Sequence, residues 1–201
     1  MPPLACELNP DLLTTPCSTN TNWHVITGAP SCGKTTLIDL FAKKGFKTAP
    51  EGARIYIERE VAAGRTIDEI RDDLPALQRG IKDMQKEIER SLPPEDCVFL
   101  DRTVLDSLAW YRIFDMDPNE FLAECFQYRY ASVFILDQLP LSLDGFRFDE
   151  QGFAVFLDEW HEKDYTALGY QVERVPVLPP AERLCFVIEK LSEQGLTLRT
   201  H

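Results

Sequence analysis

The sequence predicts an α/β fold of three layers, a parallel five-stranded sheet with helices on both faces. Short runs of β-branched and aromatic residues alternate with helical patterns along the chain, and one junction between strand and helix carries a glycine-rich motif. Strands that alternate with helices pair in parallel, because each helix returns the chain across one face of the sheet. The length of 201 residues suits one doubly wound domain of this kind.

Five short runs bounded by turn residues are typical of strands. They are Trp23–Thr27, Phe46–Thr48, Cys97–Asp101, Ala131–Asp137 and Tyr170–Val175. Apolar residues recur at helical spacing between them, over Thr35–Lys44, over Ala53–Ala63 and from Ile81 to Leu92. Helix starts are indicated by the residues Thr66 to Glu69, which can form a capping box, and by Asp117 followed by Pro118.

The chain is acidic, and its charge is unevenly distributed. It has 21 Lys and Arg residues against 33 Asp and Glu residues, a net charge of −12. The first 50 residues carry +1 and the remainder carries −13. A protein that binds nucleic acid through a broad basic surface needs the opposite balance, so we expect no nucleic-acid partner.

The cysteines and the N-terminus indicate a cytoplasmic protein. The six cysteines are scattered without a C-x-x-C pair, which fits a reducing compartment rather than a zinc site or a disulfide framework. The longest apolar runs, such as Val133–Leu136, are too short to span a membrane, so no integral membrane segment is expected. Residues 1–21 are rich in Pro, Thr, Ser and Asn and predict a flexible extension, with the domain over 22–201. The oligomeric state is left open.

The glycine-rich motif is the strongest functional signal. Residues 28–35 read Gly-Ala-Pro-Ser-Cys-Gly-Lys-Thr and match G-x-x-x-x-G-K-[ST] in full, between a strand-like and a helix-like segment. In such a loop the backbone N–H groups and the helix N-terminus face phosphate oxygens, the Lys reaches the outer phosphates, and the Thr hydroxyl helps to hold Mg²⁺. We expect nucleotide contacts from Gly28, Ser31, Cys32, Gly33, Lys34, Thr35 and Thr36. Cys32 is interpreted as a small residue tolerated in the loop; the alternative is a redox role.

A second carboxylate is expected beside the loop. The strand Cys97–Asp101 ends in an acid that can organise Mg²⁺ together with Thr35, although an Asp in this position is also a common helix cap. Arg102 follows directly, either as a clamp on phosphate or substrate or as a surface residue.

The end of the second strand supplies another candidate. Glu51 falls at the carboxyl end of this strand, where ligands of doubly wound sheets gather, and could orient or deprotonate an attacking hydroxyl. The alternative is an acid that favours a helix N-terminus. Arg54, one helical turn on, could pair with Glu51 or contact the substrate.

Two further groups are weaker candidates. Arg147 lies in an irregular stretch and could close over the phosphates as part of a flap, or be an exposed loop residue. The helix after Asp101 carries Asp106 and Trp110, with Tyr111 and Phe114. Its aromatic residues could stack on a substrate ring or form part of the core, and Asp106 and Trp110 are the substrate candidates.

Taken together, these motifs resemble the NadR-type AAA domain family, the P-loop group that includes the ribosylnicotinamide kinase domain. The similarity extends over roughly residues 23–192. The segments that carry it are Val25–Thr36, Ala49–Arg54, Phe99–Ala109, Arg129–Tyr130 with Val133–Leu136, Asp144–Arg147 and Glu182–Leu184. The resemblance implies a P-loop kinase-like fold with strand order 2-3-1-4-5 and binding of ATP with Mg²⁺. It also implies site roles for Lys34, Thr35, Glu51, Asp101, Arg102 and Arg147.

Two functions fit these residues. The first is a small-molecule kinase that transfers the ATP γ-phosphoryl group to a hydroxyl of a nucleoside-like or other small metabolite. The second is a nucleotide-dependent ATPase or GTPase-like switch acting through protein or lipid partners, since the family also contains regulators that bind GTP and lipids. The sequence has no N-K-x-D for guanine recognition, which favours ATP while leaving GTP possible. It also lacks the adenylyltransferase and DNA-binding domains attached in the bifunctional bacterial enzyme.

Overall fold

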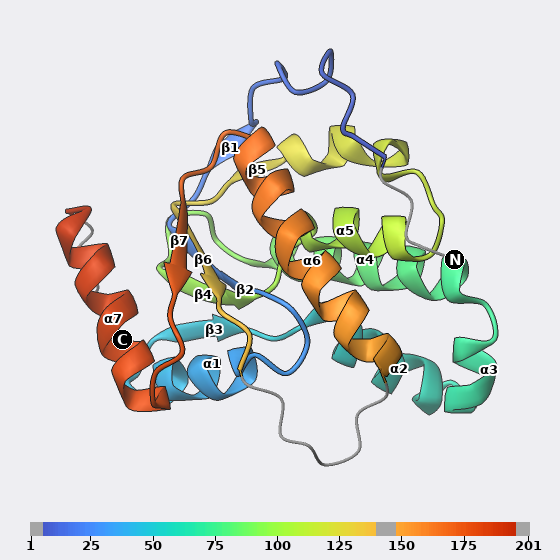
Figure 1. Cartoon of the computed structure of the whole chain (residues 1–201), viewed down its shortest axis with the longest axis horizontal. Coiled ribbons are helices and arrows are strands. Elements are labelled where there is room, and N and C mark those ends of the chain that lie inside the picture. Colours follow the sequence, from blue (N-terminus) through green and yellow to red (C-terminus); the bar gives the residue numbers. More distant parts are fainter. Residues whose placement is uncertain (1–5, 140–147, 196–201) are drawn as a thin grey trace.

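The structure is a computed structural model that describes residues 6–139 and 148–195. Its main sheet has five parallel strands in the order β3-β4-β2-β6-β7 (Figure 1). Counted along the chain within this sheet, that order is 2-3-1-4-5, as expected from the sequence. The strands are β2 (Trp23–Thr27), β3 (Lys47–Ala49), β4 (Val98–Asp101), β6 (Ser132–Leu136) and β7 (Val172–Val175).

The three middle strands form because their residues can be buried on both faces of the sheet. Every residue of β2, β4 and β6 is buried, which suits the β-branched and aromatic side chains of these runs. In the register, Ile26 of β2 pairs with Asp101 of β4 and with Phe134 of β6. The carboxyl ends of the strands therefore meet at one edge, where Asp101 lies beside the end of β2.

Alternate residues of these strands face two separate cores. On one face, α1 (Lys34–Lys43) and α7 (Pro180–Glu193) cover the sheet. Phe41 of α1 stacks on Phe99 of β4 with ring centroids 3.7 Å apart, and Val187 of α7 is fully buried in the same cluster. This packing fixes the helix that follows the glycine-rich loop against the sheet.

The opposite face is covered mainly by α5 (Asp106–Ile113) and α6 (Phe148–Ala167), the latter drawn in orange to the right of β7 in Figure 1. Leu108 and Tyr111 of α5 and Tyr165 of α6 are buried against Val25 and Val133 of the sheet. This core anchors α5 directly after the strand that ends in Asp101.

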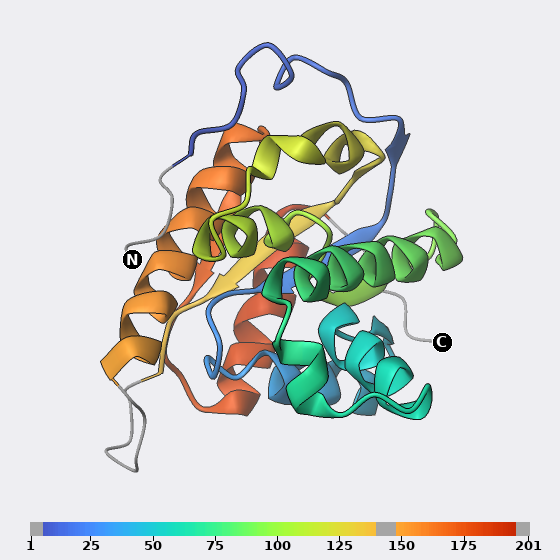
Figure 2. The same ribbon diagram turned by 90° about the vertical axis from the view of Figure 1, so that its right-hand side faces the viewer.

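A group of three helices lies to one side of the sheet (Figure 2). These are α2 (Gly52–Ala62), α3 (Ile67–Arg71) and α4 (Leu74–Ser91). The α3 helix begins with the capping box expected at Thr66 and Glu69. Glycines permit close contact between α2 and α4: a Cβ on Gly80 would overlap the Tyr56 ring, and one on Gly52 would lie 2.7 Å from Gln85 Oε1.

Residues 6–21 pack on the domain, which differs from the flexible extension expected over 1–21. The short strand β1 (Thr19–Asn20) pairs in parallel with β5 (Tyr128–Arg129), and Leu8 is buried. Arg112 Nε of α5 donates to the Cys6 carbonyl at 2.7 Å. Leu12, Leu13 and Cys17 also pack against the main core, so both backbone hydrogen bonds and apolar side chains attach the segment. Residues 1–5 lie outside the described residues.

The helix start expected at Asp117 produces only short 3-10 turns. Asp117 caps η1 (Pro118–Glu120) by accepting from Asn119 N–H, and η2 (Leu122–Phe126) follows. Asn119 is also held by the N-terminal segment, since its Oδ1 accepts from Asn9 N–H at 2.8 Å. This second attachment competes with continuation of a regular helix.

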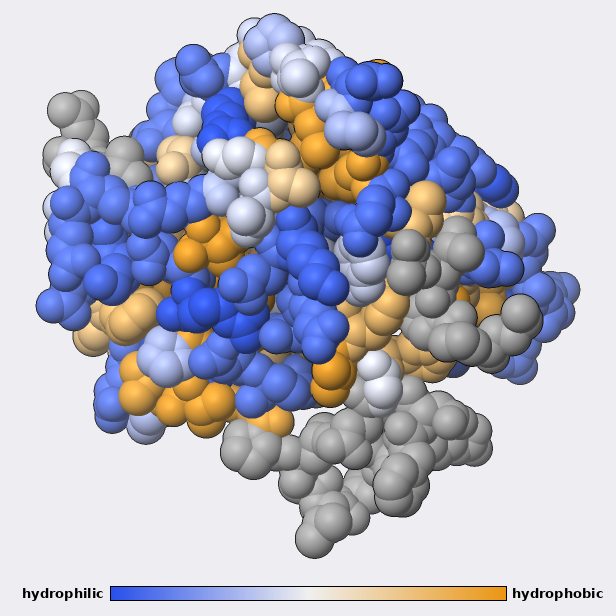
Figure 3. Space-filling view, turned by 45° about the horizontal axis from the view of Figure 1, so that its top comes forward, coloured by the Kyte–Doolittle hydropathy of each residue, from blue (hydrophilic) through white to orange (hydrophobic). Residues whose placement is uncertain are grey.

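The visible surface in Figure 3 is mostly hydrophilic, with smaller hydrophobic patches. Among the helices that the structure describes, none combines the length and the apolarity that a membrane crossing requires. All six cysteines fall within the described residues and are free.

Candidate active site

The glycine-rich loop has the backbone shape that a phosphate cradle requires. Gly28 has φ 136°, and a Cβ there would lie 2.8 Å from the Leu136 carbonyl oxygen of β6. Gly33, the N-cap of α1, has φ 93°. Residues that carry a side chain rarely adopt these φ values, so both positions require glycine. Ser31 also has positive φ, at 62°, and Thr35 and Thr36 lie in the first turn of α1 with exposed side chains.

Lys34 is buried and turned inward across the loop. Its Nζ donates to the Ala29 carbonyl at 2.8 Å and lies 3.6 Å from Cys32 Sγ. Burial lowers the pKa of Lys34 below its ordinary value, because the ammonium loses hydration. A cation held by one carbonyl inside a ring of backbone N–H groups is suited to an anionic partner.

Arg183 of α7 braces this loop from behind. Its side chain is buried, and its guanidinium donates to the carbonyls of Cys32, Asp137 and Pro176 at 2.5, 3.1 and 3.0 Å. Cys32 itself is fully buried in the core beneath the loop, which fits the interpretation of a small residue tolerated there. Arg183 falls in the Glu182–Leu184 segment, but nothing in that short motif indicates which backbone groups it holds.

Thr35 and Asp101 meet at the end of β4. Thr35 Oγ1 donates to Asp101 Oδ2 at 3.3 Å, whereas Oδ1 is buried without a hydrogen-bond partner among the described residues. Burial raises the pKa of Asp101 to about 6. A hydroxyl and an unsatisfied buried carboxylate oxygen are hard ligands that fit Mg²⁺. The described residues contain no cluster of three or more His, Cys, Asp or Glu side chains suited to a metal; Mg²⁺ at phosphate sites uses few protein ligands.

Arg102, Glu51 and Asp106 form a charged group beside this pair. Arg102 Nε donates to Glu51 Oε1 at 2.9 Å, and Nη1 donates to Asp106 Oδ1 at 3.2 Å. Asp106 also accepts from Thr103 N–H at 2.9 Å, Tyr165 O–H at 2.9 Å and the Thr27 hydroxyl. Asp106 thus anchors Arg102 from the buried side. The Arg102 side chain is only 9% exposed, whereas the Glu51 side chain is 35% exposed.

The backbone of Arg102 contributes to its placement. Its φ of 70° is left-handed, a conformation that costs a non-glycine residue about 1–2 kcal/mol. The N–H of Arg102 donates to the Ile26 carbonyl at 3.1 Å, which ties this turn to the central strand. The side chain that leaves this turn reaches Glu51.

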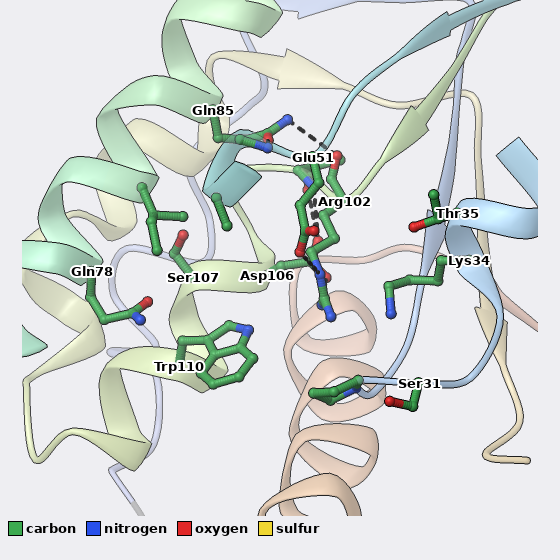
Figure 4. Close-up of a pocket in the computed structure, with 15 residues that line it drawn as sticks. Ser31, Lys34, Thr35, Glu51, Gln78, Gln85, Arg102, Asp106, Ser107 and Trp110 are labelled. Carbon is green, nitrogen blue, oxygen red and sulfur yellow. Dashed lines mark hydrogen bonds and ion pairs between the residues drawn. The ribbon is translucent and has the colours of Figure 1, made fainter. Parts of the chain in front are cut away.

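Lys34, Thr35, Glu51, Arg102 and Asp106 line one cavity of about 390 Å³ (Figure 4). Ser31, Lys34 and Thr35 lie on one side, and Gln78, Ser107 and Trp110 lie on the other. The Glu51–Arg102 pair stands between the two sides. The remaining lining residues are Pro30, Gly52, Ala53, Ile81, Gln85, Thr103 and Asp106.

The structure brings together most of the residues predicted for the site, with differences at a few positions. Arg54 does not pair with Glu51; it is exposed, 3.9 Å from Glu58, because α2 directs it outward. It lines a smaller hollow of about 230 Å³ together with Thr35 and Asp101. Trp110 lines the main cavity, and Tyr111 belongs to the core. Arg147 lies outside the described residues and stays a prediction.

Four polar residues of the cavity were not anticipated: Gln78, Gln85, Thr103 and Ser107. Gln78 and Gln85 come from α4, and Ser107 comes from α5. Both glutamines are buried, at 6% and 3% exposure. Their spacing of seven residues places them on one face of the helix, and buried amides on a helix face were the available signal.

The AAA domain family matches residues 23–183 of the chain. This span includes the loop at Gly28–Thr35, Glu51, the Asp101–Arg102 pair and the bracing Arg183. The chain belongs to this AAA domain family.

Solved structures share the fold. A NadR protein in complex with NR is 21% identical with a TM-score of 0.60, over 89% of this chain and 53% of that one. The chain thus spans about half the length of that NadR protein. Thymidylate kinase from Candida albicans is 12% identical with a TM-score of 0.56, over 87% and 92% of the two chains. Shikimate kinase from Bacteroides thetaiotaomicron is 17% identical with a TM-score of 0.53, over 87% and 98%.

These likenesses establish that the AAA domain has the fold of P-loop kinases. No curated protein sequence matches the chain. Because one fold supports many reactions, the reaction of this chain has to be inferred from the residues of its site.

Proposed function

We propose that this AAA domain protein is a Mg²⁺-dependent small-molecule kinase. It would transfer the γ-phosphoryl group of ATP to a hydroxyl of a nucleoside-like or other small metabolite. The observation that carries the proposal is the shared cavity: phosphate-binding groups line one side, and the Glu51–Arg102 pair separates them from a pocket for a second molecule. A nucleotide switch needs the first part but not the second.

The nucleotide side follows from the loop. Lys34 Nζ, now on the Ala29 carbonyl, would turn to the outer phosphates, while the loop N–H groups bind the inner ones. Thr35 and Asp101 would hold Mg²⁺, which neutralises charge on the phosphates when bound. With a pKa of about 6, Asp101 is ionised at neutral pH, as this role requires.

Glu51 and Arg102 act on the acceptor. Glu51 would take the proton of the attacking hydroxyl as the new O–P bond forms and the bond from the γ-phosphorus to ADP breaks. Arg102, anchored by Asp106, would face the charge that develops on the transferred group. Because Asp106 already accepts from Nη1 of the guanidinium, the Arg102 side chain needs little reorganisation during the reaction.

The far wall of the cavity supports an acceptor with an uncharged planar part. Gln78 and Ser107 offer neutral hydrogen-bonding groups, and the Trp110 indole offers a flat apolar face (Figure 4). The cations among the lining residues are Lys34 and Arg102, both assigned to the phosphoryl group. An acidic acceptor would find no cation among the described residues of this wall, whereas a neutral nucleoside-like compound would be accommodated. The free cysteines are consistent with our proposal of a cytoplasmic location.

The test has two stages. Thermal shifts with ATP, GTP and other nucleotides, with and without Mg²⁺, identify the nucleotide; mass spectrometry of a metabolite mixture incubated with it identifies the acceptor. Lys34→Ala should abolish stabilisation by nucleotide, whereas Lys44→Ala, exposed at the other end of α1, should retain it. Tight nucleotide binding without any phosphorylated metabolite would reject the kinase in favour of a switch.

A further inference from the structure

Gln85 connects two loops that carry reactive groups. It lies in the middle of α4, is 3% exposed and uses both ends of its amide. Its Oε1 accepts from Gly52 N–H at 3.0 Å, and its Nε2 donates to the Arg102 carbonyl at 3.2 Å. One buried side chain therefore bonds the backbone next to Glu51 and the backbone of Arg102 itself.

The bond to Gly52 anchors the backbone next to Glu51. Glu51 is the N-cap of α2, and its side chain makes no capping hydrogen bond; its Oε1 accepts from Arg102 Nε–H instead. Gly52 N–H is one of the helix N-terminal donors that lack an intrahelical acceptor, and Gln85 Oε1 satisfies it. The first residue of α2 is therefore held beside the point where the Glu51 side chain leaves the backbone.

The bond to Arg102 holds a strained turn. The left-handed φ of 70° is maintained from both sides of the residue: its N–H is bonded to Ile26 and its carbonyl to Gln85. A buried carbonyl without that donor would lose a hydrogen bond, and the turn could relax toward an ordinary conformation. The position of the guanidinium over the cavity depends on this peptide geometry.

Gln85 is itself held in place. Its Nε2 lies 3.4 Å from Glu89 Oε1, which accepts from Val104 N–H at 2.8 Å, while Glu89 Oε2 accepts from Tyr130 O–H at 2.9 Å. A flipped amide would place its NH₂ group against Gly52 N–H and its oxygen against the Arg102 carbonyl, so these two partners fix its orientation. The Gln85 side chain is therefore held in a single conformation.

From these contacts we infer that Gln85 is a positioning residue, which sets the Glu51–Arg102 pair for action on the acceptor hydroxyl through its hydrogen bonds to the backbone of Gly52 and Arg102. The inference rests on the proposed kinase function for its kinetic consequence, but the placement of Arg102 can be measured without any reaction.

The test compares Gln85→Met and Gln85→Glu with Lys86→Met. Methionine keeps the length and removes both hydrogen bonds. Glutamate can still accept from Gly52 N–H but cannot donate to the Arg102 carbonyl, and it provides a second variant if methionine impairs folding. Lys86 is the next residue of α4, but its ammonium pairs with Glu124, away from both loops, so its loss controls for a change in this helix.

The first readout is the ¹H–¹⁵N NMR signal of Arg102 Nε–H, assigned by its loss in Arg102→Lys. Wild type and Lys86→Met should show a signal protected from exchange with water, because Nε–H is bonded to Glu51. Gln85→Met should lose it and Gln85→Glu should weaken it. An unchanged signal in the folded Gln85 variants would overturn the inference, whatever the reaction of the protein.

The second readout is kinetic. We expect kcat to fall about 10- to 100-fold in Gln85→Met, as a small misplacement of reacting groups does, while KM for ATP stays within about twofold. A lower Tm with unchanged kcat would show a purely structural role and reject the inference. If the wild type phosphorylates no acceptor, the kinase proposal fails, and the NMR signal alone decides the role of Gln85.

Discussion

Replacement of Glu51 by glutamine separates turnover from stability and from nucleotide binding. Glutamine has nearly the same shape, and its carbonyl oxygen can still accept from Arg102 Nε–H across the 2.9 Å contact. The change therefore removes a charge and a proton acceptor while retaining the hydrogen bond. Because the Glu51 side chain is 35% exposed, we expect unfolding free energy to change by no more than ~1 kcal/mol.

The expected loss in turnover is much larger. A positioned general base contributes about 10²–10⁴-fold to the rate, so kcat should fall by this factor, equivalent to ~3–5 kcal/mol of activation free energy. The affinity for ATP with Mg²⁺ should remain, since Lys34, Thr35 and Asp101 are unchanged. Steady-state kinetics with the identified acceptor, together with calorimetric titration of ATP, measure the two quantities separately.

Glu58→Gln is the matched control. Glu58 lies on the same helix, is exposed and pairs only loosely with Arg54 at 3.9 Å, so its loss should alter neither kcat nor affinity. If Glu51→Gln kept the wild-type kcat, the assignment of a base would be refuted. A loss confined to ATP affinity would instead place Glu51 in the nucleotide site.

Three further predictions concern the cavity wall, a buried ion pair and a buried histidine. Gln78→Leu should raise KM for the acceptor about 2- to 10-fold, because one hydrogen bond to the acceptor is lost, whereas KM for ATP should not change. Initial-rate kinetics measure both values, and an unchanged KM for the acceptor would contradict this contact. Asp164→Asn should cost ~3–5 kcal/mol in urea unfolding, because the fully buried Arg112 guanidinium loses its bidentate partner at 2.7 and 2.8 Å; a cost below ~1 kcal/mol contradicts the reasoning. Burial lowers the pKa of His24 from 6.5 to about 4, so the unfolded chain takes up a proton first as the pH falls through this window, and stability is lost. Acidification from pH 7 to 5 should therefore destabilise wild type by ~2 kcal/mol more than His24→Leu in urea unfolding, and equal losses would show that His24 is protonated in the folded state.

Much of the fold was predictable because its signals are local. The burial of β2, β4 and β6 on both faces produces continuous apolar runs, and these were located to within one or two residues of their observed ends. The loop at Gly28–Thr35 was equally predictable from the sequence, because its glycines are required by φ values that other residues rarely adopt. The strand order came with the family resemblance rather than from these patterns.

The structure brings several predicted site residues together, but the contacts between them were not predictable from the sequence. Glu51 and Arg102 come from different strand ends, so their contact depends on how the loops fold, which spacing along the chain does not reveal. Arg54 has the helical spacing to meet Glu51, yet α2 begins at Gly52 and directs it to solvent. The N-terminal segment was misjudged because its few apolar residues, among them Leu8 and Leu12, lie in a polar composition typical of a flexible tail, yet they pack on the core.

The role of α4 was hidden for a different reason. Ile81, Met84 and Ile88 follow the spacing of an ordinary amphipathic helix, and that pattern assigned no role to its glutamines. In the structure Gln85 is more deeply buried than Met84, at 3% against 7% exposure. A polar residue can replace an apolar one in such a stripe only where backbone groups of neighbouring loops need partners, and those loops are far away in sequence.

The two glycines at the contact of α2 with α4 limit how the acceptor pocket can diverge. Gly52 and Gly80 leave no space for a Cβ, so the separation of these helices cannot be widened or narrowed by small steps in side-chain size. New acceptor specificity would have to arise at positions that point past this contact into the cavity, namely Gln78, Ile81 and Trp110. The frame around the reactive pair would then stay constant while the accepted compound changes, which makes these three positions the place to begin when the preference is redesigned.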